Sequence, residues 1–511
     1  MQRTTRRTFL DQLDTLTKAA VVGHCLPLST GCNDGRDGRE ADIALRAVRS
    51  KANLLPGPAT DVWTVTGEVL NGPPGALLPQ PSLALGPTLH LRKGQQVRLT
   101  FDNQLSEPTT LHWHGLSVPA EMDGQPHSPI AAGRRFTYTF PVLNGAGTYF
   151  YHAHPHERTG EHVYRGMAGA LIVHDDEEDA LVLPRDEFDV PLVVQDRVFG
   201  ADNQLVYAPS RMQAMQGWLG DRIAVNGALN YTLNAATRAY RLRIINSSNS
   251  RIYRLAWQDG TPLIVMGTDG GLLERPIQRE YAMLGPGERL ELWADFSART
   301  VGSQLALVSL AFNAGMTMGG MMNTGLPQGA ALTIMTVRFD RGSTDRLPLP
   351  ERLVTIPRYR ELDAVNVARP RPIVIGNRMM SWTLNGRTFQ LEEAPEDDRI
   401  ELGALEVWEI DNRGMGGGGM GGGMGGGGMG GMMAMPHPIH VHAAQFQVLS
   451  RTGVTHQGYV DEGWKDTLLV MPGEAAKVAI RFNDYTGLYL YHCHILEHED
   501  RGMMLNFRVV P

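Results

Sequence analysis

Two strand patterns occur three times along this 511-residue chain, in the same order each time. The first is an alternating apolar run followed within two residues by asparagine, at residues 89–101, 240–244 and 405–410. The second starts with glycine and then alternates, at residues 133–140, 287–292 and 473–478. Alternation with a period of two predicts strands with one buried face. A repeated pair of strand patterns therefore predicts three related β-domains.

Short alternating runs separated by turn residues begin near residue 55, and almost no helical periodicity accompanies them. This pattern is typical of β-sandwiches, so we predict an all-β fold of three sandwich domains. We place the domains at residues 46–178, 179–345 and 346–511, after an export signal and linker at residues 1–45.

The N-terminal segment carries Arg6-Arg7 followed by Thr8-Phe9-Leu10, which resembles a twin-arginine export signal. The segment ending at Cys32 resembles a lipoprotein-type cleavage box, which would tether the protein to a membrane surface. The alternative is a frayed polar tail. No apolar run approaches the ~18–20 residues of a membrane span. We therefore expect an exported protein of the periplasm or cell envelope without a transmembrane segment.

Net charge and cysteine content exclude some classes of function. The net charge is −7 and no long basic run occurs, which argues against nucleic acid as a partner. Of three cysteines, Cys25 and Cys32 lie in the leader, so the folded body holds Cys493 alone. One thiol makes no disulfide scaffold, and among histidines it is more often a ligand or a nucleophile.

The 17 histidines are concentrated in a few segments. Chance placement would give fewer than one His-x-His pair, yet five occur; we treat His154/His156 as incidental because Pro155 interrupts it. Each remaining pair puts two imidazoles on one face of a strand. These pairs are His112/His114, His152/His154, His440/His442 and His492/His494. The second domain contains no such pair, because no histidine lies between His174 and His437.

Eight imidazoles exceed what one metal ion can use, since zinc sites normally stop at four ligands. Imidazole suits copper, zinc, iron and nickel, so a cluster of several ions is the simplest use. For any single pair, a hydrogen-bonded strand surface remains the alternative.

Cys493 lies between His492 and His494, and a strand here would point the thiol away from both imidazoles. Cys493, His498 and Met503 offer a thiolate, an imidazole and a weak thioether, and His437 can supply the second imidazole of a blue-copper site. A one-copper site would then be covalently joined to a histidine-only cluster. Reductants give up single electrons, whereas reduction of dioxygen to water takes four, so such a junction suits an oxidase.

At these segments the chain resembles the three-domain multicopper oxidases, which include laccases, bilirubin oxidases and bacterial cuprous oxidases. All four ligand segments match in order, and the repeats extend the resemblance over roughly residues 55–511. The resemblance implies cupredoxin-like Greek-key domains and four copper ions: one type 1, one type 2 and a type 3 pair. It also implies that dioxygen is the acceptor and that Cu(I) or small phenolic or aromatic compounds are the reductants.

The resemblance also implies a role for individual residues. The type 1 copper would be held by His437, Cys493, His498 and Met503. The type 2 copper would be held by His112 and His440. The type 3 pair would be held by His114, His152, His154, His442, His492 and His494. Asp123 and Glu499 match acids that assist proton delivery; solvated turn carboxylates are the alternative. The segment Gly463–Thr467 resembles one beneath the type 1 site, and we assign it no chemistry.

A Gly/Met-rich insert at residues 414–435 ends just before His437. Residues 414–431 are 14 glycines and 4 methionines, and four more methionines lie at Met316, Met318, Met321 and Met322. Thioethers are soft ligands that favour Cu(I), so the insert favours cuprous ion as reductant. The alternative is a permissive linker in which methionine fills apolar gaps.

We therefore predict a monomeric exported multicopper oxidase. A copper-binding or storage protein of the periplasm without turnover is the main alternative, and a cupredoxin scaffold that lost its activity is a third. The complete ligand set disfavours both.

Overall fold

The repeated sequence patterns form the same antiparallel strand pair in three different sheets. These pairs are β5 (Gln96–Asn103) with β7 (Arg135–Pro141), β14 (Ala239–Asn246) with β19 (Arg289–Asp295), and β25 (Leu405–Asp411) with β29 (Ala475–Arg481). In each sheet an earlier strand runs parallel to the first member of the pair. These strands are β1 (Glu40–Ala52), β10 (Asp189–Arg197) and β22 (Arg371–Arg378). The sequence repeat is therefore a repeat of topology.

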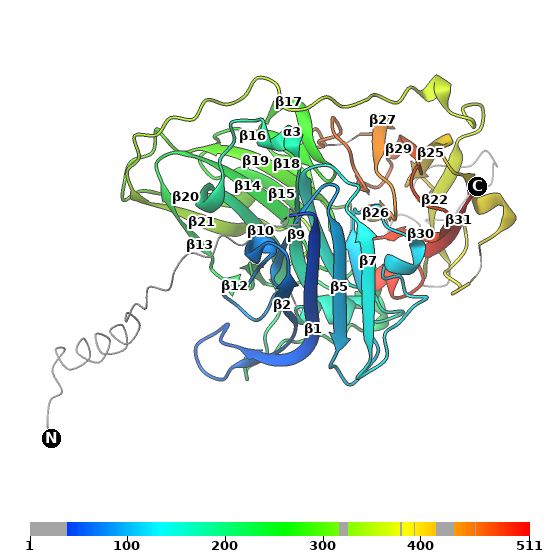
Figure 1. Cartoon of the computed structure of the whole chain (residues 1–511), viewed down its shortest axis with the longest axis horizontal. Helices are drawn as coiled ribbons and strands as arrows, with labels where there is room; N and C mark the ends of the chain where they lie inside the picture. The colour runs from blue at the N-terminus through cyan, green and yellow to red at the C-terminus, as the bar shows by residue number, and fades with distance from the viewer. Residues whose placement is uncertain (1–37, 316–324, 379–380, 393, 415–433, 455) are drawn as a thin grey trace, which may run out of the picture. The chain divides into compact units, whose positions relative to one another are not determined.

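A computed structural model describes residues 38–315, 325–378, 381–392, 394–414, 434–454 and 456–511 (Figure 1). Its sheets form three sandwiches. The first sandwich combines the orders β2-β1-β5-β7 and β3-β4-β9-β8-β6. Its remaining strands are β2 (Thr60–Asn71), β3 (Leu77–Leu78), β4 (Thr88–Arg92), β6 (Leu111–His114), β8 (Gly147–Ala153) and β9 (Ala168–His174).

The second sandwich combines the orders β12-β11-β10-β14-β19-β16-β17 and β13-β21-β20-β15-β18. Its remaining strands are β11 (Arg222–Val225), β12 (Ala228–Leu229), β13 (Thr232–Ala236), β15 (Tyr253–Trp257), β16 (Leu263–Thr268), β17 (Gly271–Arg279), β18 (Ala282–Leu284), β20 (Gln304–Ser309) and β21 (Leu332–Arg341).

The third sandwich combines the orders β23-β22-β25-β29-β27 and β24-β31-β30-β26-β28. Its remaining strands are β23 (Ser381–Leu384), β24 (Arg399–Glu401), β26 (His437–Val441), β27 (Phe446–Thr452), β28 (Thr467–Val470), β30 (Gly487–Cys493) and β31 (Met504–Val510). Short helices lie in the connections. They are α2 (Thr159–Arg165), α3 (Asp176–Asp179), α4 (Arg211–Gln216) and α5 (Leu496–Glu499).

Each sandwich encloses a core built from the inward residues of its strands. Trp113 and Phe101 lie in the first core, Leu242 and Leu292 in the second, and all four are buried. Cys493 lies in the third core, so the predicted thiol ligand is enclosed by apolar side chains rather than exposed.

The predicted all-β fold of three cupredoxin-like sandwiches is confirmed, and one boundary differs. β1 begins at Glu40, within the predicted linker at residues 1–45, because its alternating residues pair with both β2 and β5. The leader, the insert from residue 415 to 433 and the methionine cluster at residues 316–322 lie outside the described residues. Among the described helices, none has the length and apolarity to span a membrane.

Candidate metal centre

Strand register brings the predicted histidine pairs together. In the first sandwich, antiparallel pairing of β6 with β8 puts His112 opposite His152. In the third, pairing of β26 with β30 puts His440 opposite His492 and Ile439 opposite Cys493. Because a strand alternates its faces, the register that joins His440 to His492 also turns Cys493 toward the other side.

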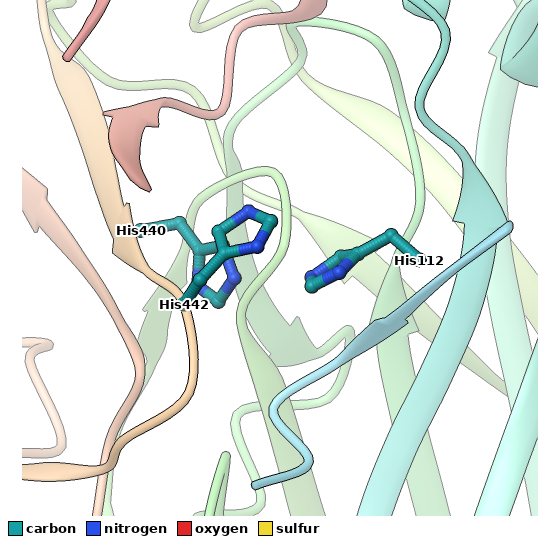
Figure 2. A group of neighbouring side chains, drawn as sticks. All are labelled: His112, His440 and His442. Atoms are coloured by element: carbon teal, nitrogen blue, oxygen red, sulfur yellow. The ribbon is translucent and has the colours of Figure 1, made fainter. Parts of the chain in front are cut away.

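The eight imidazoles of the four pairs gather in one buried cluster, each at most 2% exposed. His112 stacks on His442 with ring centroids 3.9 Å apart, and Figure 2 shows His112 facing His440 and His442. His114 stacks on His440 at 3.7 Å. Three triplets have ligand atoms within 4.8 Å of one another. They are His112/His440/His442, His112/His114/His152 and His154/His442/His492. The first and third sandwiches therefore share one centre.

Backbone carbonyls orient several of these rings. His112 Nδ1 donates to the Asp123 carbonyl oxygen at 2.9 Å, and His152 Nδ1 donates to that of Ala153 at 3.0 Å. His440 Nδ1 donates to the Asp466 carbonyl oxygen at 2.9 Å. Each bond fixes the tautomer and leaves Nε2 as an unprotonated acceptor facing the cluster. A metal-ligating histidine needs one such free nitrogen while its other ring N–H is hydrogen-bonded.

The ring nitrogens that face inward fit metal ions. Nε2 of His112, His152 and His440 has no hydrogen-bond partner within the described chain, although each atom is buried. An unsatisfied buried polar atom costs about 1–3 kcal/mol, which a metal bond removes. Burial lowers the pKa of His154 and of His492 to about 3, so both imidazoles are neutral and can act as ligands.

Asp123 and Glu499 hold the outer edge of the same cluster. Asp123 Oδ2 lies 2.7 Å from His442 Nδ1, and Asp123 Oδ1 lies 3.2 Å from His112 Nδ1. Glu499 Oε2 lies 3.1 Å from His492 Nδ1, and Oε1 lies 3.4 Å from His154 Nδ1. Asp123 is 0% exposed and Glu499 is 3% exposed. Neither is a solvated turn carboxylate, and burial raises the pKa of Glu499.

A separate sulfur-containing group lies on the other face of β30. Cys493 Sγ is 3.4 Å from His437 Nδ1 and 3.5 Å from His498 Nδ1. Met503 is fully buried in the same core, and its carbonyl oxygen accepts from the Cys493 amide at 3.0 Å. His498 Nε2 donates to the Met215 carbonyl oxygen at 3.0 Å, which fixes its tautomer and leaves Nδ1 toward the sulfur.

The sequence analysis missed two residues at the edge of the cluster: Asp466, which contacts a clustered histidine, and Arg289, which pairs with Asp466. The segment Gly463–Thr467 was assigned no chemistry, yet Asp466 Oδ1 lies 3.0 Å from His114 Nε2. Arg289 of the second sandwich forms an ion pair with Asp466, and both are 0–1% exposed. The available signal was a charged pair, Lys465-Asp466, directly before the apolar strand β28.

Comparison with known proteins identifies the family. Multicopper oxidase models match residues 82–178 and 365–511. The multicopper oxidase mco of Staphylococcus haemolyticus is 31% identical over 83% of this chain and 82% of its own length. The laccase of Bacillus subtilis is 30% identical over 84% and 90%. The crystal structure of McoA from Aquifex aeolicus aligns with a TM-score of 0.76 and 31% identity, over 93% and 97% of the two chains.

The chain belongs to the multicopper oxidases. It couples one-electron oxidation of a reductant to the four-electron reduction of dioxygen to water, using type 1, type 2 and type 3 copper. The alternative of a storage protein without turnover is not favoured.

Proposed function

We propose that the described residues divide between two copper sites. His437, Cys493, His498 and Met503 hold type 1 copper. His112 and His440 hold type 2 copper. The remaining six ligands hold the type 3 pair: His114, His152, His154, His442, His492 and His494. The observation that carries this division is the opposite facing of Cys493 and its two neighbours on one strand, which supports one sulfur site and one imidazole cluster.

The bound copper ions would accept single electrons at the sulfur site and reduce dioxygen at the cluster. The chain supplies the path between them: Cys493 is covalently bonded to the residues on either side of it. His492 Nδ1 donates to the Cys493 carbonyl oxygen at 3.1 Å, which adds a second connection from the thiol-bearing residue to the cluster. The protein thereby fixes geometry and access while the metal carries the redox chemistry.

Asp123 and Glu499 supply protons to the cluster. Reduction of dioxygen to water consumes four protons, and the remaining ring N–H groups of His112, His152 and His440 are held in hydrogen bonds to carbonyl oxygens, so another donor is needed. Each carboxylate contacts two of the clustered histidines from outside, and both are buried near the reaction site. A group that transfers a proton must lie within hydrogen-bond reach or one water away.

Cys493→Ser tests the site division. We expect the intense thiolate-to-copper absorption and the oxidase activity to disappear, while the imidazole cluster still binds copper. Copper content and visible absorption measure the two effects separately. If the copper-loaded wild-type protein lacks the intense absorption, the type 1 assignment is wrong.

Cuprous ion is the reductant that this site favours. The imidazole edge of His498 is covered by the Met215 carbonyl oxygen, and Trp382 packs edge-to-face against His437 with centroids 4.5 Å apart. His437 and His498 are at most 1% exposed, so the described part of the chain offers a phenol no exposed imidazole edge at this site. Met215 and Met435 are both 3% exposed and belong to the same core cluster as Cys493. Met215 is bonded to His498 through its carbonyl oxygen and Met435 lies two residues before His437, so two thioether residues adjoin proposed type 1 ligands. Thioethers favour Cu(I).

Deletion of residues 414–431 tests this choice. We expect Cu(I) oxidation to fall while oxidation of a phenol stays at its wild-type level, because the deletion removes the four thioethers of the insert but leaves Met215, Met435 and every proposed ligand of the type 1 site in place. Oxygen consumption with each reductant gives the ratio of the two activities. Equal loss of both activities, or loss of neither, contradicts the proposal.

The organisation of the chain completes the proposal. The domains divide near residues 178 and 345, and the protein works as a monomer. The twin-arginine leader exports it to the periplasm or cell envelope. Cys32 provides a lipid tether there. Folded export suits a protein whose metal centre joins two domains. Replacement of Arg6 and Arg7 by lysine should retain the protein in the cytoplasm, which fractionation measures.

A further inference from the structure

The second sandwich contributes none of the clustered histidines, yet one of its side chains holds a carboxylate that contacts the cluster. Arg289 is the first residue of β19 and is 1% exposed. Its Nη1 donates to Asp466 Oδ1 at 2.6 Å and its Nη2 donates to Asp466 Oδ2. Such a two-point contact fixes the plane of a carboxylate as well as its position.

The rest of the guanidinium is equally constrained. Nε donates to the Thr148 carbonyl oxygen at 2.9 Å, Nη1 to that of Gly287 at 2.9 Å, and Nη2 to that of Asp269 at 2.8 Å. All five guanidinium N–H groups thus have acceptors. Arg289 therefore holds Asp466 from a fixed position anchored in the first and second sandwiches.

Asp466 in turn contacts one histidine from each of the other two sandwiches. Its carboxylate Oδ1 accepts from His114 Nε2 at 3.0 Å, and its carbonyl oxygen accepts from His440 Nδ1 at 2.9 Å. Thr467 Oγ1 donates to the same Oδ1 at 2.9 Å, which helps to fix it. The ion pair is tightly packed against the backbone of Gly115. A Cβ at that position would lie 2.5 Å from Asp466 Oδ2 and 2.7 Å from Arg289 Nη2.

The ring of His114 is reversed relative to its neighbours. His112, His152 and His440 use Nδ1 for a carbonyl and leave Nε2 free, whereas His114 uses Nε2 for Asp466 and leaves Nδ1 without a partner. A carboxylate only accepts, so its contact with Nε2 places the proton there and leaves the lone pair on Nδ1.

We propose that Arg289 is a positioning residue which, through Asp466, selects the tautomer and orientation in which His114 presents Nδ1 to copper. The second domain, which holds none of the proposed copper ligands, would thereby set the orientation of one ligand of the type 3 pair. This inference rests on the proposed role of His114 as a type 3 ligand. Outer partners of metal-bound histidine contribute roughly 10- to 100-fold to metal affinity, so the effect is large enough to measure.

Three variants test the proposal in the copper-loaded full chain: Arg289→Met, Arg289→Lys and Asp466→Asn. Arg251→Met is the matched control, because Arg251 forms a buried ion pair with Asp196 in the same domain and contacts no clustered histidine in the described chain. The readouts are total copper, the blue absorption of the type 1 site, and the share of copper that is silent in electron paramagnetic resonance, since a coupled type 3 pair is silent.

We expect Arg289→Met to keep the blue absorption but to lose copper or the silent share, with type 3 copper bound roughly 10- to 100-fold more weakly. Arg289→Lys retains the cation with one contact point and should restore part of the loss. Asp466→Asn keeps an acceptor for His114 but faces a guanidinium that only donates, so it should show an intermediate loss. Arg251→Met should leave the silent share unchanged.

Two results overturn the proposal: a silent share in Arg289→Met equal to that of the wild type, or an equal loss in Arg251→Met. If Arg289→Met does not fold, Arg289→Lys and Asp466→Asn decide by the same measurement. The histidine nitrogen resonances of copper-free, ¹⁵N-histidine-labelled wild-type protein give a separate test, with His114→Gln identifying the signal; a proton on Nδ1 contradicts it. Failure of the ligand assignment is distinguishable, since a copper-loaded His114→Gln variant would then keep the wild-type silent share.

Discussion

A glycine at the same place in each repeat gives a sharp test of how the second domain contacts the cluster. Gly133, Gly287 and Gly473 each start the second strand pattern, with φ of +69°, +83° and +85°. A Cβ at Gly133 or Gly473 meets nothing within 4 Å. A Cβ at Gly287 would lie 2.9 Å from Cγ and Cδ2 of His494. The three positions share backbone strain but differ in what they face.

Replacing each glycine with alanine separates the cost of backbone strain, which all three positions share, from the effect of displacing His494, which only Gly287 faces. The left-handed backbone costs an L-residue about 1–2 kcal/mol, so all three variants should lose that much unfolding free energy. Carbon atoms pack best about 3.5–4.0 Å apart, so alanine at Gly287 must push the His494 ring outward by several tenths of an ångström. That ring is 2% exposed and has His114 at 4.9 Å and His152 at 5.2 Å between centroids. Overpacking of this kind costs about 1–3 kcal/mol more.

Urea unfolding of the copper-free variants measures the free energies, and paramagnetic resonance of the loaded variants measures the silent copper share. We expect Gly133→Ala and Gly473→Ala to keep the wild-type share and Gly287→Ala to lose much of it. The reasoning is refuted if Gly287→Ala matches its two counterparts in both measurements.

Further expectations concern protons, pH and metal. Glu499→Gln should lower the rate of dioxygen reduction by roughly 10²–10⁴-fold with copper content retained, as turnover and copper analysis would show, because proton transfer typically contributes that much. In the copper-free protein, burial lowers the pKa of His154 to about 3 and of His440 to about 4, so the unfolded state binds more protons at acidic pH. Stability should be fully present above about pH 6.5 and should fall as pH drops toward these values, by up to about 1.4 kcal/mol per pH unit for each histidine; a flat profile in urea titrations would contradict this. Removal of copper should lower the unfolding midpoint at neutral pH, because metal that binds only the folded state stabilises it; calorimetry with and without chelator measures the shift.

Most of the fold and of the candidate site that could be predicted from the sequence follows from local patterns. The three sandwiches follow from alternation with a period of two, and the four histidine pairs follow from spacing, because a strand places residues i and i+2 on one face. The opposite facing of Cys493 and His492 needed only that rule. The start of β1 was missed because the polar stretch that ends at Glu40 looks like linker and gives no sign that the residues after it, Ala41 to Ala47, pair with β5.

Contacts between distant segments could not be predicted in this way. Arg289 and Asp466 are 177 positions apart, and neither lies in a motif with histidine. The cover over His498 comes from Met215, which is 283 positions away. Long-range side-chain partners depend on how whole domains pack, and a single sequence contains no local period that reports it.

The residue at one equivalent position of the repeat differs between the second domain and the other two. Arg135, Arg289 and Ala475 are each the first residue of the equivalent strand. Arg135 is exposed and pairs with Asp102 at the surface, and Ala475 is buried without a charge. Arg289 is buried with its charge, which is costly unless a partner and full hydrogen bonding compensate, and a buried pair is weak evidence for stability. Its neighbour Gly287 faces His494 directly. The second domain holds no proposed ligand, yet it places Gly287 against His494 and uses a fully hydrogen-bonded Arg289 to hold Asp466, the partner of His114. Positioning of the metal centre therefore explains this arrangement better than stability alone.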